Sequence, residues 1–115
     1  MLTRITRRAL LAFAGGGALF VCAASGSAQE APSAQIVIDN FAFQPATLTV
    51  RAGTAVTWLN QDEEPHTVMS ADPQVSFKSP ALDTRDKFTF TFAKPGTYKY
   101  FCTIHSHMVG TVVVQ

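Results

Sequence analysis

The sequence predicts an all-β domain, either a sandwich or a barrel, on three observations. Short segments rich in Val, Thr, Phe and Tyr follow one another and are separated by turn residues, which is typical of antiparallel β-proteins. Residues 88–92 alternate strictly between Phe and Thr, as expected of a strand with one buried face. Finally, no segment keeps the apolar period of a helix over several turns.

The first expected strand begins at Ile36-Val37-Ile38 and continues through Phe41 and Phe43, which follow at a spacing of two. Pro45 ends this strand because proline has no backbone N–H to donate to a sheet. A second short strand is expected at 47–50, before a turn at 51–53 that contains glycine.

A third strand is expected at 54–60, with Val56 and Trp58 on one face. An acidic turn follows, and a further strand at 66–70 would place His66 at its start. Residues 71–83 contain two prolines and are expected to be mostly irregular, with a brief strand near 75–77.

The alternating segment 87–92 is the next strand, and a Pro-Gly turn at 94–97 follows it. The strand expected at 97–102 places Tyr98, Tyr100 and Cys102 on one face, and if that face is inward the Cys102 sulfur points toward the interior. A last strand at 109–115 closes the sheet. The connection between these last two strands therefore carries the residues discussed next.

Residues 100–108 hold a cysteine, two of the three histidines and a methionine. Cys102, His105 and Met108 have the spacing C-x2-H-x2-M, and His66 lies upstream. One thiolate, two imidazoles and one thioether form the donor set of a blue-copper electron-transfer site. Zinc also accepts Cys and His, but a thioether favours copper. The sequence thus predicts one copper ion held by these four residues.

Two other residues near this set have open roles. His107 is interpreted as a surface residue beside the site; the alternatives are an alternative ligand or a second, weaker metal contact. Met69 is interpreted as a core or surface-patch residue, because the loop already supplies a thioether. Four protein donors leave no coordination position for a substrate, so an enzyme is not expected.

The 115 residues suffice for one domain, and residues 1–28 are predicted to be a signal peptide. Arginines precede an apolar run at 9–24, and small residues at 26–28 suit a signal peptidase. The pair Arg7-Arg8 resembles a twin-arginine export signal. The predicted location of the mature protein is therefore the periplasm.

Two alternatives for the leader are a membrane anchor and a lipid anchor on Cys22. The apolar run is short for a membrane span and contains three consecutive glycines, and Val21 does not fit a lipid-attachment motif. Residues 29–34 are expected to be a flexible lead, and 35–115 the folded domain. We expect no membrane span in the mature form.

Without the leader, six basic residues stand against eight acidic ones, a net charge of about −2. The domain has no basic patch of the kind that binds nucleic acid. Its only cysteine is Cys102, so it forms no internal disulfide. The acidic run 62–64 has two interpretations: it steers a basic partner, or it is a solvated turn.

Several motifs together resemble the cupredoxins, the small blue-copper proteins, and especially their amicyanin-like and plastocyanin-like members. They are the ligand loop described above and five segments: Asp39-Asn40-Phe41-Ala42-Phe43-Gln44-Pro45, Val50-Arg51-Ala52-Gly53-Thr54, Val56-Thr57-Trp58-Leu59-Asn60, Pro65-His66-Thr67-Val68 and Pro95-Gly96-Thr97-Tyr98. The likeness covers about residues 35–115. The short C-x2-H-x2-M spacing is similar to that of amicyanin.

The resemblance implies a Greek-key β-sandwich of about seven to eight strands with one type 1 copper. His66, Cys102 and His105 would be the strong ligands and Met108 the weak axial one. It also implies that electrons pass through the exposed edge of the His105 ring. We expect transient redox-protein partners, and a monomer suits such a diffusing carrier. The competing function is copper handling, as a chaperone or buffer, with the same ligands.

The sequence departs from the family pattern in three places, one of them a pair of residues. Ile104 stands where many members have proline before the second ligand histidine. Thr67 stands where many have an asparagine whose side chain links the two ligand loops. Ser106-His107 replaces a more apolar pair expected in amicyanin, so the partner of amicyanin cannot be assigned to this protein by resemblance.

Overall fold

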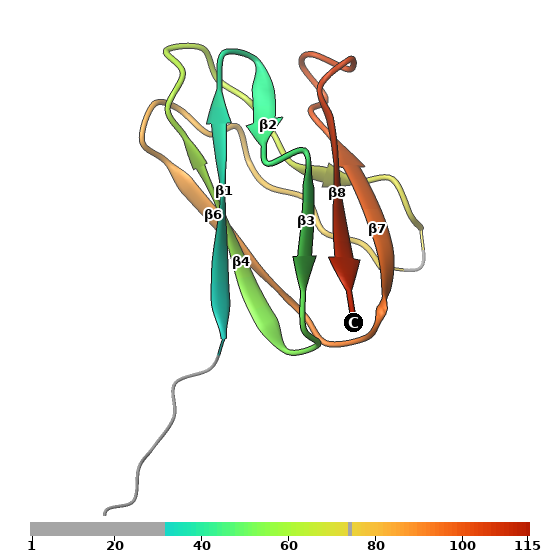
Figure 1. Ribbon diagram of the computed structural model, residues 1–115. Helices are drawn as coiled ribbons and strands as arrows, with labels where there is room; N and C mark the ends of the chain where they lie inside the picture. Colours follow the sequence, from blue (N-terminus) through green and yellow to red (C-terminus); the bar gives the residue numbers. More distant parts are fainter. Residues whose placement is uncertain (1–31, 74) are drawn as a thin grey trace, which may run out of the picture. The chain divides into compact units, whose positions relative to one another are not determined.

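The computed structural model describes residues 32–73 and 75–115, shown in colour in Figure 1. The predicted signal peptide at 1–28 lies outside the described residues. The described part contains eight strands and no helix, which confirms the all-β prediction. In chain order they are β1 (Ser33–Asp39), β2 (Ala42–Gln44), β3 (Thr47–Val50), β4 (Thr54–Asn60), β5 (Met69–Ser70), β6 (Lys87–Phe92), β7 (Gly96–Phe101) and β8 (Val109–Val114).

The strands form two four-stranded sheets, in the orders β2-β1-β4-β6 and β3-β8-β7-β5. β1 pairs with β4 and β3 pairs with β8 in parallel, whereas the other pairs are antiparallel. Neighbours that are distant in sequence require long connections, as in a Greek-key sandwich. β1 begins at Ser33, two residues before the expected start of the domain.

The core lies between the sheets and is strongly aromatic. Trp58 is completely buried on β4 and contacts Phe77, Phe88, Phe92 and Tyr100. Alternation along each strand explains this burial, because every second side chain of a strand points to the same face. The described part has no helix that is long and apolar enough to cross a membrane.

The prediction that the first strand continues through Phe41 and Phe43 is wrong. The chain turns back at Asn40 and Phe41, and β1 and β2 then form an antiparallel pair. Both turn residues have positive φ, 54° and 58°, a conformation that side chains with a Cβ rarely adopt. The Phe41 side chain is therefore 41% exposed, whereas Phe43 is buried.

The strand expected at 66–70 is also shorter than predicted, because β5 contains only Met69 and Ser70. His66 instead makes an isolated antiparallel bridge with Leu82. No strand forms at 75–77 in this described segment; the bridge between Met69 and Lys78 takes its place. The predicted strands at 47–50, 54–60 and 87–92 are confirmed with their bounds.

Strands β7 and β8 support the loop that carries the Cys-His-Met motif. Tyr98, Tyr100 and Cys102 are all buried, so the face that they share is the inward one. Tyr100 pairs with Gly110 across the two strands, and its ring lies over that glycine. A Cβ at Gly110 would lie only 2.3 Å from the ring carbon Cζ. Glycine is therefore required here for packing beneath the loop.

Candidate metal centre

The loop at 102–108 connects β7 to β8 and is closed by its own backbone. The Cys102 N–H donates to the Met108 carbonyl at 3.1 Å, and the Met108 N–H donates to the His105 carbonyl at 2.9 Å. These bonds hold the three residues of the C-x2-H-x2-M motif in one compact turn. Met108 is 2% exposed and belongs to the hydrophobic core.

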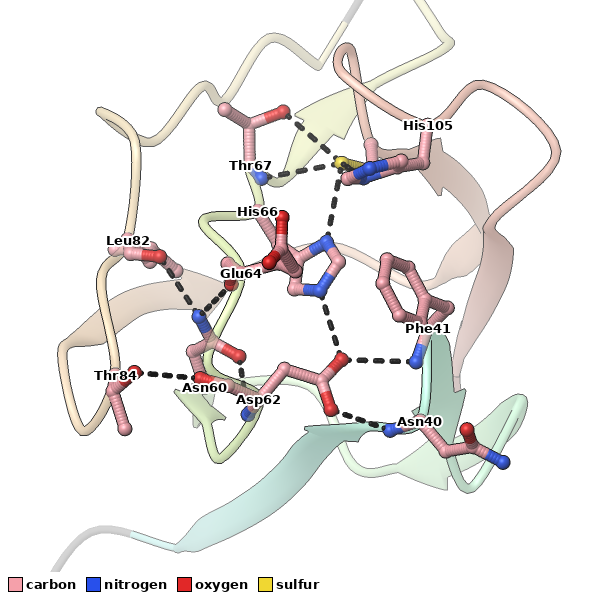
Figure 2. Close-up of polar contacts among 11 residues, drawn as sticks. Asn40, Phe41, Asn60, Asp62, Glu64, His66, Thr67, Leu82, Thr84 and His105 are labelled. Atoms are coloured by element: carbon pink, nitrogen blue, oxygen red, sulfur yellow. Dashed lines mark hydrogen bonds and ion pairs between the residues drawn. The ribbon is translucent and has the colours of Figure 1, made fainter.

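His66 comes from the connection between β4 and β5. Its N–H donates to the Leu82 carbonyl at 3.1 Å, and the Leu82 N–H donates back to the His66 carbonyl at 2.7 Å. The buried Asn60 amide adds hydrogen bonds to the carbonyls of Glu64 and Leu82, as Figure 2 shows. The backbone on both sides of His66 is therefore fixed.

The structure brings three of the predicted ligand residues together. His66 Nδ1 lies 3.8 Å from Cys102 Sγ, and His105 Nδ1 lies 3.9 Å from it. The three potential ligand atoms all lie within 4.8 Å of one another. His66 and Cys102 are fully buried, whereas His105 is half-buried. One histidine edge thus reaches toward the surface and the other does not.

The thiol of Cys102 is prepared for deprotonation. Burial alone raises its pKa, but hydrogen bonds from the Thr67 and His105 backbone N–H groups, together with the contacts of both imidazoles with the sulfur, outweigh this effect. The result is a pKa lowered from 9.0 to about 6. The thiolate is the form that binds metals, so at neutral pH the ligand is already in its binding form.

Thr67 links the two segments that supply the site. Its hydroxyl accepts a hydrogen bond from the Thr103 N–H at 2.7 Å and lies 2.8 Å from the Thr103 hydroxyl. Its own N–H donates to Cys102 Sγ at 3.4 Å. Although Thr67 departs from the family's asparagine, the two segments are still joined by a side chain at this position.

His107 and Met69, the two residues near the motif whose roles were left open, lie at different places relative to the ligand cluster. His107 is exposed, and its ring centroid lies 6.4 Å from that of His105, outside the three-residue cluster. Met69 is half-buried on β5 and pairs with Phe101, the residue before Cys102. Among the described residues, His107 is not part of the cluster of histidine and cysteine ligand atoms.

The acidic run at 62–64 divides into two parts. Glu63 and Glu64 are exposed, but Asp62 is turned inward and binds His66 and the backbone of the 40–41 turn. Neither this role of Asp62 nor the contact of Phe41 with both histidines was predicted. Asp62 lies four residues before His66, whereas Phe41 is distant in sequence from both ligand segments.

A family model described as a cupredoxin-like domain matches residues 11–114. This chain belongs to the cupredoxin-like family. The Amicyanin-alpha of Methylorubrum extorquens is 38% identical to it over 112 residues, which is 93% of each chain. The amicyanin of Paracoccus denitrificans is 34% identical, over 77% of this chain and 72% of its own length.

Solved structures agree with this assignment. A purple cupredoxin from Nitrosopumilus maritimus has a TM-score of 0.65 at 37% identity, over 71% of this chain and 99% of its own. The oxidised state of an amicyanin variant has a TM-score of 0.69 at 31% identity, over 72% of this chain and 82% of its own. The predicted likeness to the amicyanin and plastocyanin group of cupredoxins is therefore confirmed.

The residues of this cupredoxin fit copper as their cofactor. A thiolate and two imidazole nitrogens form a tight soft donor cluster, and the buried Met108 lies in the same short loop. The family and this donor chemistry together confirm the expected cofactor, one type 1 copper ion. The role of each residue as a ligand is treated below as a proposal.

Proposed function

We propose that this cupredoxin is an electron carrier of the periplasm that transfers one electron at a time between redox proteins. His66, Cys102, His105 and Met108 are the proposed ligands of its copper ion. The observation that carries the proposal is the cluster of Cys102 Sγ and the two histidine ring nitrogens within 4.8 Å. When bound, copper supplies a Cu(I)/Cu(II) couple.

The burial of the proposed ligands favours electron transfer over copper handling. His66 and Cys102 are fully buried and Met108 is nearly so. A chaperone or buffer needs ligands that incoming and outgoing ions can reach, whereas an electron needs only a short path through one exposed edge. His105, which is half-buried, provides that edge. No enzymatic reaction is proposed, because four protein donors leave no position for a substrate.

The surface beside the site suits a transient partner. The exposed large apolar side chains of the described residues are Phe41, Ile104 and Val109, and all three belong to the 40–41 turn or to the segment around the ligand loop. Such a small apolar surface fits the weak interfaces of electron-transfer complexes. Exposed Glu63 and Glu64 would favour encounter with a basic partner. A monomer suits this exchange.

The predicted leader at 1–28 supports the periplasmic location, because its basic, apolar and small-residue regions follow the order of an export signal. A direct test is to express the full chain with its native N-terminus and sequence the first residues of the exported product. A mature protein that begins after residue 28 is expected. Retention of the intact leader in the cytoplasm would contradict the proposed location.

The central test is the visible spectrum of the domain loaded with Cu(II), before and after ascorbate. We expect an intense thiolate-to-copper band that disappears on reduction, and no such band in a Cys102→Ser variant. A pale product would contradict the proposed site.

A second test separates the carrier from a copper-handling protein. A carrier should exchange electrons with itself fast and lose copper to a chelator slowly. Slow self-exchange with fast copper loss would favour copper handling. A His107→Ala variant should match the wild type in both rates.

A further inference from the structure

Asp62 occupies an unusual position for a residue in an acidic run. Its side chain is only 11% exposed and accepts three hydrogen bonds (Figure 2). Oδ1 accepts from the Asn40 N–H at 2.7 Å, and Oδ2 accepts from the Phe41 N–H at 2.9 Å. Oδ2 also lies 2.8 Å from His66 Nε2. One carboxylate thus joins a distant turn to a proposed metal ligand.

The contact with Asp62 determines which nitrogen of His66 carries a proton. An ionised carboxylate only accepts hydrogen bonds, and both oxygens of this one already accept from backbone N–H groups, Oδ1 from Asn40 and Oδ2 from Phe41. Nε2 of His66 must therefore be the donor. In the neutral ring Nδ1 then keeps its lone pair, and Nδ1 is the nitrogen that faces Cys102 Sγ.

The second histidine lacks this support. Within the described part of the chain, the Nε2 atom of His105 has no hydrogen-bond partner, although its Nδ1 lies 3.9 Å from the same sulfur. Its ring is held by packing against the rings of His66 and Phe41. The two histidines therefore differ: a carboxylate fixes one, and aromatic contacts hold the other.

The same carboxylate also fixes the position of Phe41. Asn40 and Phe41 both adopt the left-handed conformation, which is unfavourable for residues that have a Cβ, and Asp62 binds both of their N–H groups. The Phe41 ring consequently stands edge-on to His66 and His105, with centroid distances of 5.3 and 5.1 Å. Releasing the turn would loosen the packing of both imidazoles.

We propose that Asp62 is a positioning residue for the copper centre. It holds His66 with the proton on Nε2 and Nδ1 free for the metal, and it holds the 40–41 turn so that Phe41 packs against both histidines. The proposal rests on the proposed function in that His66 must be a copper ligand. Carboxylates that orient a metal-bound histidine in this way strengthen metal binding by about 10- to 100-fold.

The experiment compares Asp62→Asn and Asp62→Ala with Glu63→Gln, which removes one negative charge from the exposed neighbour. The first readout is the tautomer of His66 in the copper-free protein, measured by long-range ¹H–¹⁵N NMR at a pH where the imidazole is neutral. The second is the rate of copper loss to a chelator. The third is the visible spectrum of each loaded protein.

We expect the wild type and Glu63→Gln to show the Nε2–H tautomer of His66 and equal rates of copper loss. Asp62→Ala should lose the tautomer preference and lose copper about 10- to 100-fold faster, with an altered spectrum. Asp62→Asn should be intermediate, because its carbonyl oxygen still accepts from His66 but the amide nitrogen cannot accept from the turn.

Two results would overturn the proposal: an Nδ1–H tautomer in the copper-free wild type, or wild-type copper loss and tautomer in both Asp62 variants. The wild-type measurement decides the question even if Asp62→Ala does not fold. Failure of the proposed function would look different, since the loaded wild type would then lack the intense band whatever the tautomer of His66.

Discussion

Gly110 provides a stability prediction whose size follows from one contact. In a Gly110→Ala variant the new Cβ would lie 2.3 Å from both Cζ and the hydroxyl oxygen of Tyr100. The ring cannot swing away, because it is 1% exposed and stands edge-on to Trp58 at 5.3 Å and to Phe43 at 4.7 Å. The β7–β8 pair must therefore separate or the core must repack.

Overpacking of this kind typically costs about 1–3 kcal/mol. The collision involves a ring held on two sides, so we expect the upper part of that range, about 2–3 kcal/mol, for Gly110→Ala. For a domain of this size such a loss corresponds to a decrease in Tm of roughly 8–24 °C. The effect is large compared with a total stability of about 5–15 kcal/mol.

The assay is urea unfolding of the copper-free protein, followed by the fluorescence of Trp58, the single tryptophan. Copper is left out because a ligand that binds the folded state would raise the apparent stability. A double-mutant cycle with Tyr100→Leu tests the cause. In that background the added methyl group should cost less than about 1 kcal/mol. Equal costs in both backgrounds would refute the argument.

Three further predictions concern the centre itself. The ultraviolet absorbance of the copper-free protein should report a Cys102 thiolate with a midpoint near pH 6, absent from Cys102→Ser. This pKa is below its ordinary value of 9.0, so the thiolate should stabilise the copper-free protein fully above about pH 9, less as the pH falls, and not at all below about pH 6. Denaturant titrations from pH 9 to 6 measure this as the difference in free energy of unfolding between the wild type and Cys102→Ser. A difference that does not change with pH would contradict the prediction. Met108→Leu should keep copper but raise the reduction potential measured by voltammetry, since the axial ligand tunes it, whereas loss of copper would show that the thioether is needed for binding. Thr67→Val should lower the free energy of unfolding by about 1–3 kcal/mol, because it leaves the Thr103 N–H without its acceptor; a Thr67→Ser variant should retain most of that stability.

The strands whose first and last residues were predicted correctly are those in which the alternation of residue types in the sequence matches the alternation of buried and exposed side chains. β6 alternates Phe and Thr, and β4 buries every second residue including Val56 and Trp58. Alternation of this kind is imposed by the geometry of a strand between a core and solvent. It can therefore be recognised without knowing the partner strands.

The turn at Asn40 and Phe41 could not be recognised in this way. Phe41 and Phe43 are themselves spaced by two, as in a strand, so their spacing does not show that the chain reverses before them. The left-handed turn is stabilised by Asp62, which lies 22 and 21 residues away in sequence. A conformation held by a distant side chain leaves no local pattern.

The metal centre shows the same division between local and distant information. Cys102, His105 and Met108 lie within seven residues, so their spacing predicts a common site. His66 was placed with them by its residue type, and the structure brings its Nδ1 to 3.8 Å from Cys102 Sγ. Asp62 was interpreted as a steering charge or a solvated residue, because nothing in a run of three acids distinguishes the one that turns inward.

The difference between the two histidines bears on how an electron carrier meets two opposed requirements. It must keep its ion through many cycles, and it must also give partners access to the electron. In the proposed centre, His66 is buried and bound to Asp62, so it serves retention. His105 is half-buried beside the exposed ring of Phe41, so it serves access. Because separate residues meet the two requirements, changes near His105 should alter electron exchange more than copper affinity, and changes at Asp62 should do the reverse.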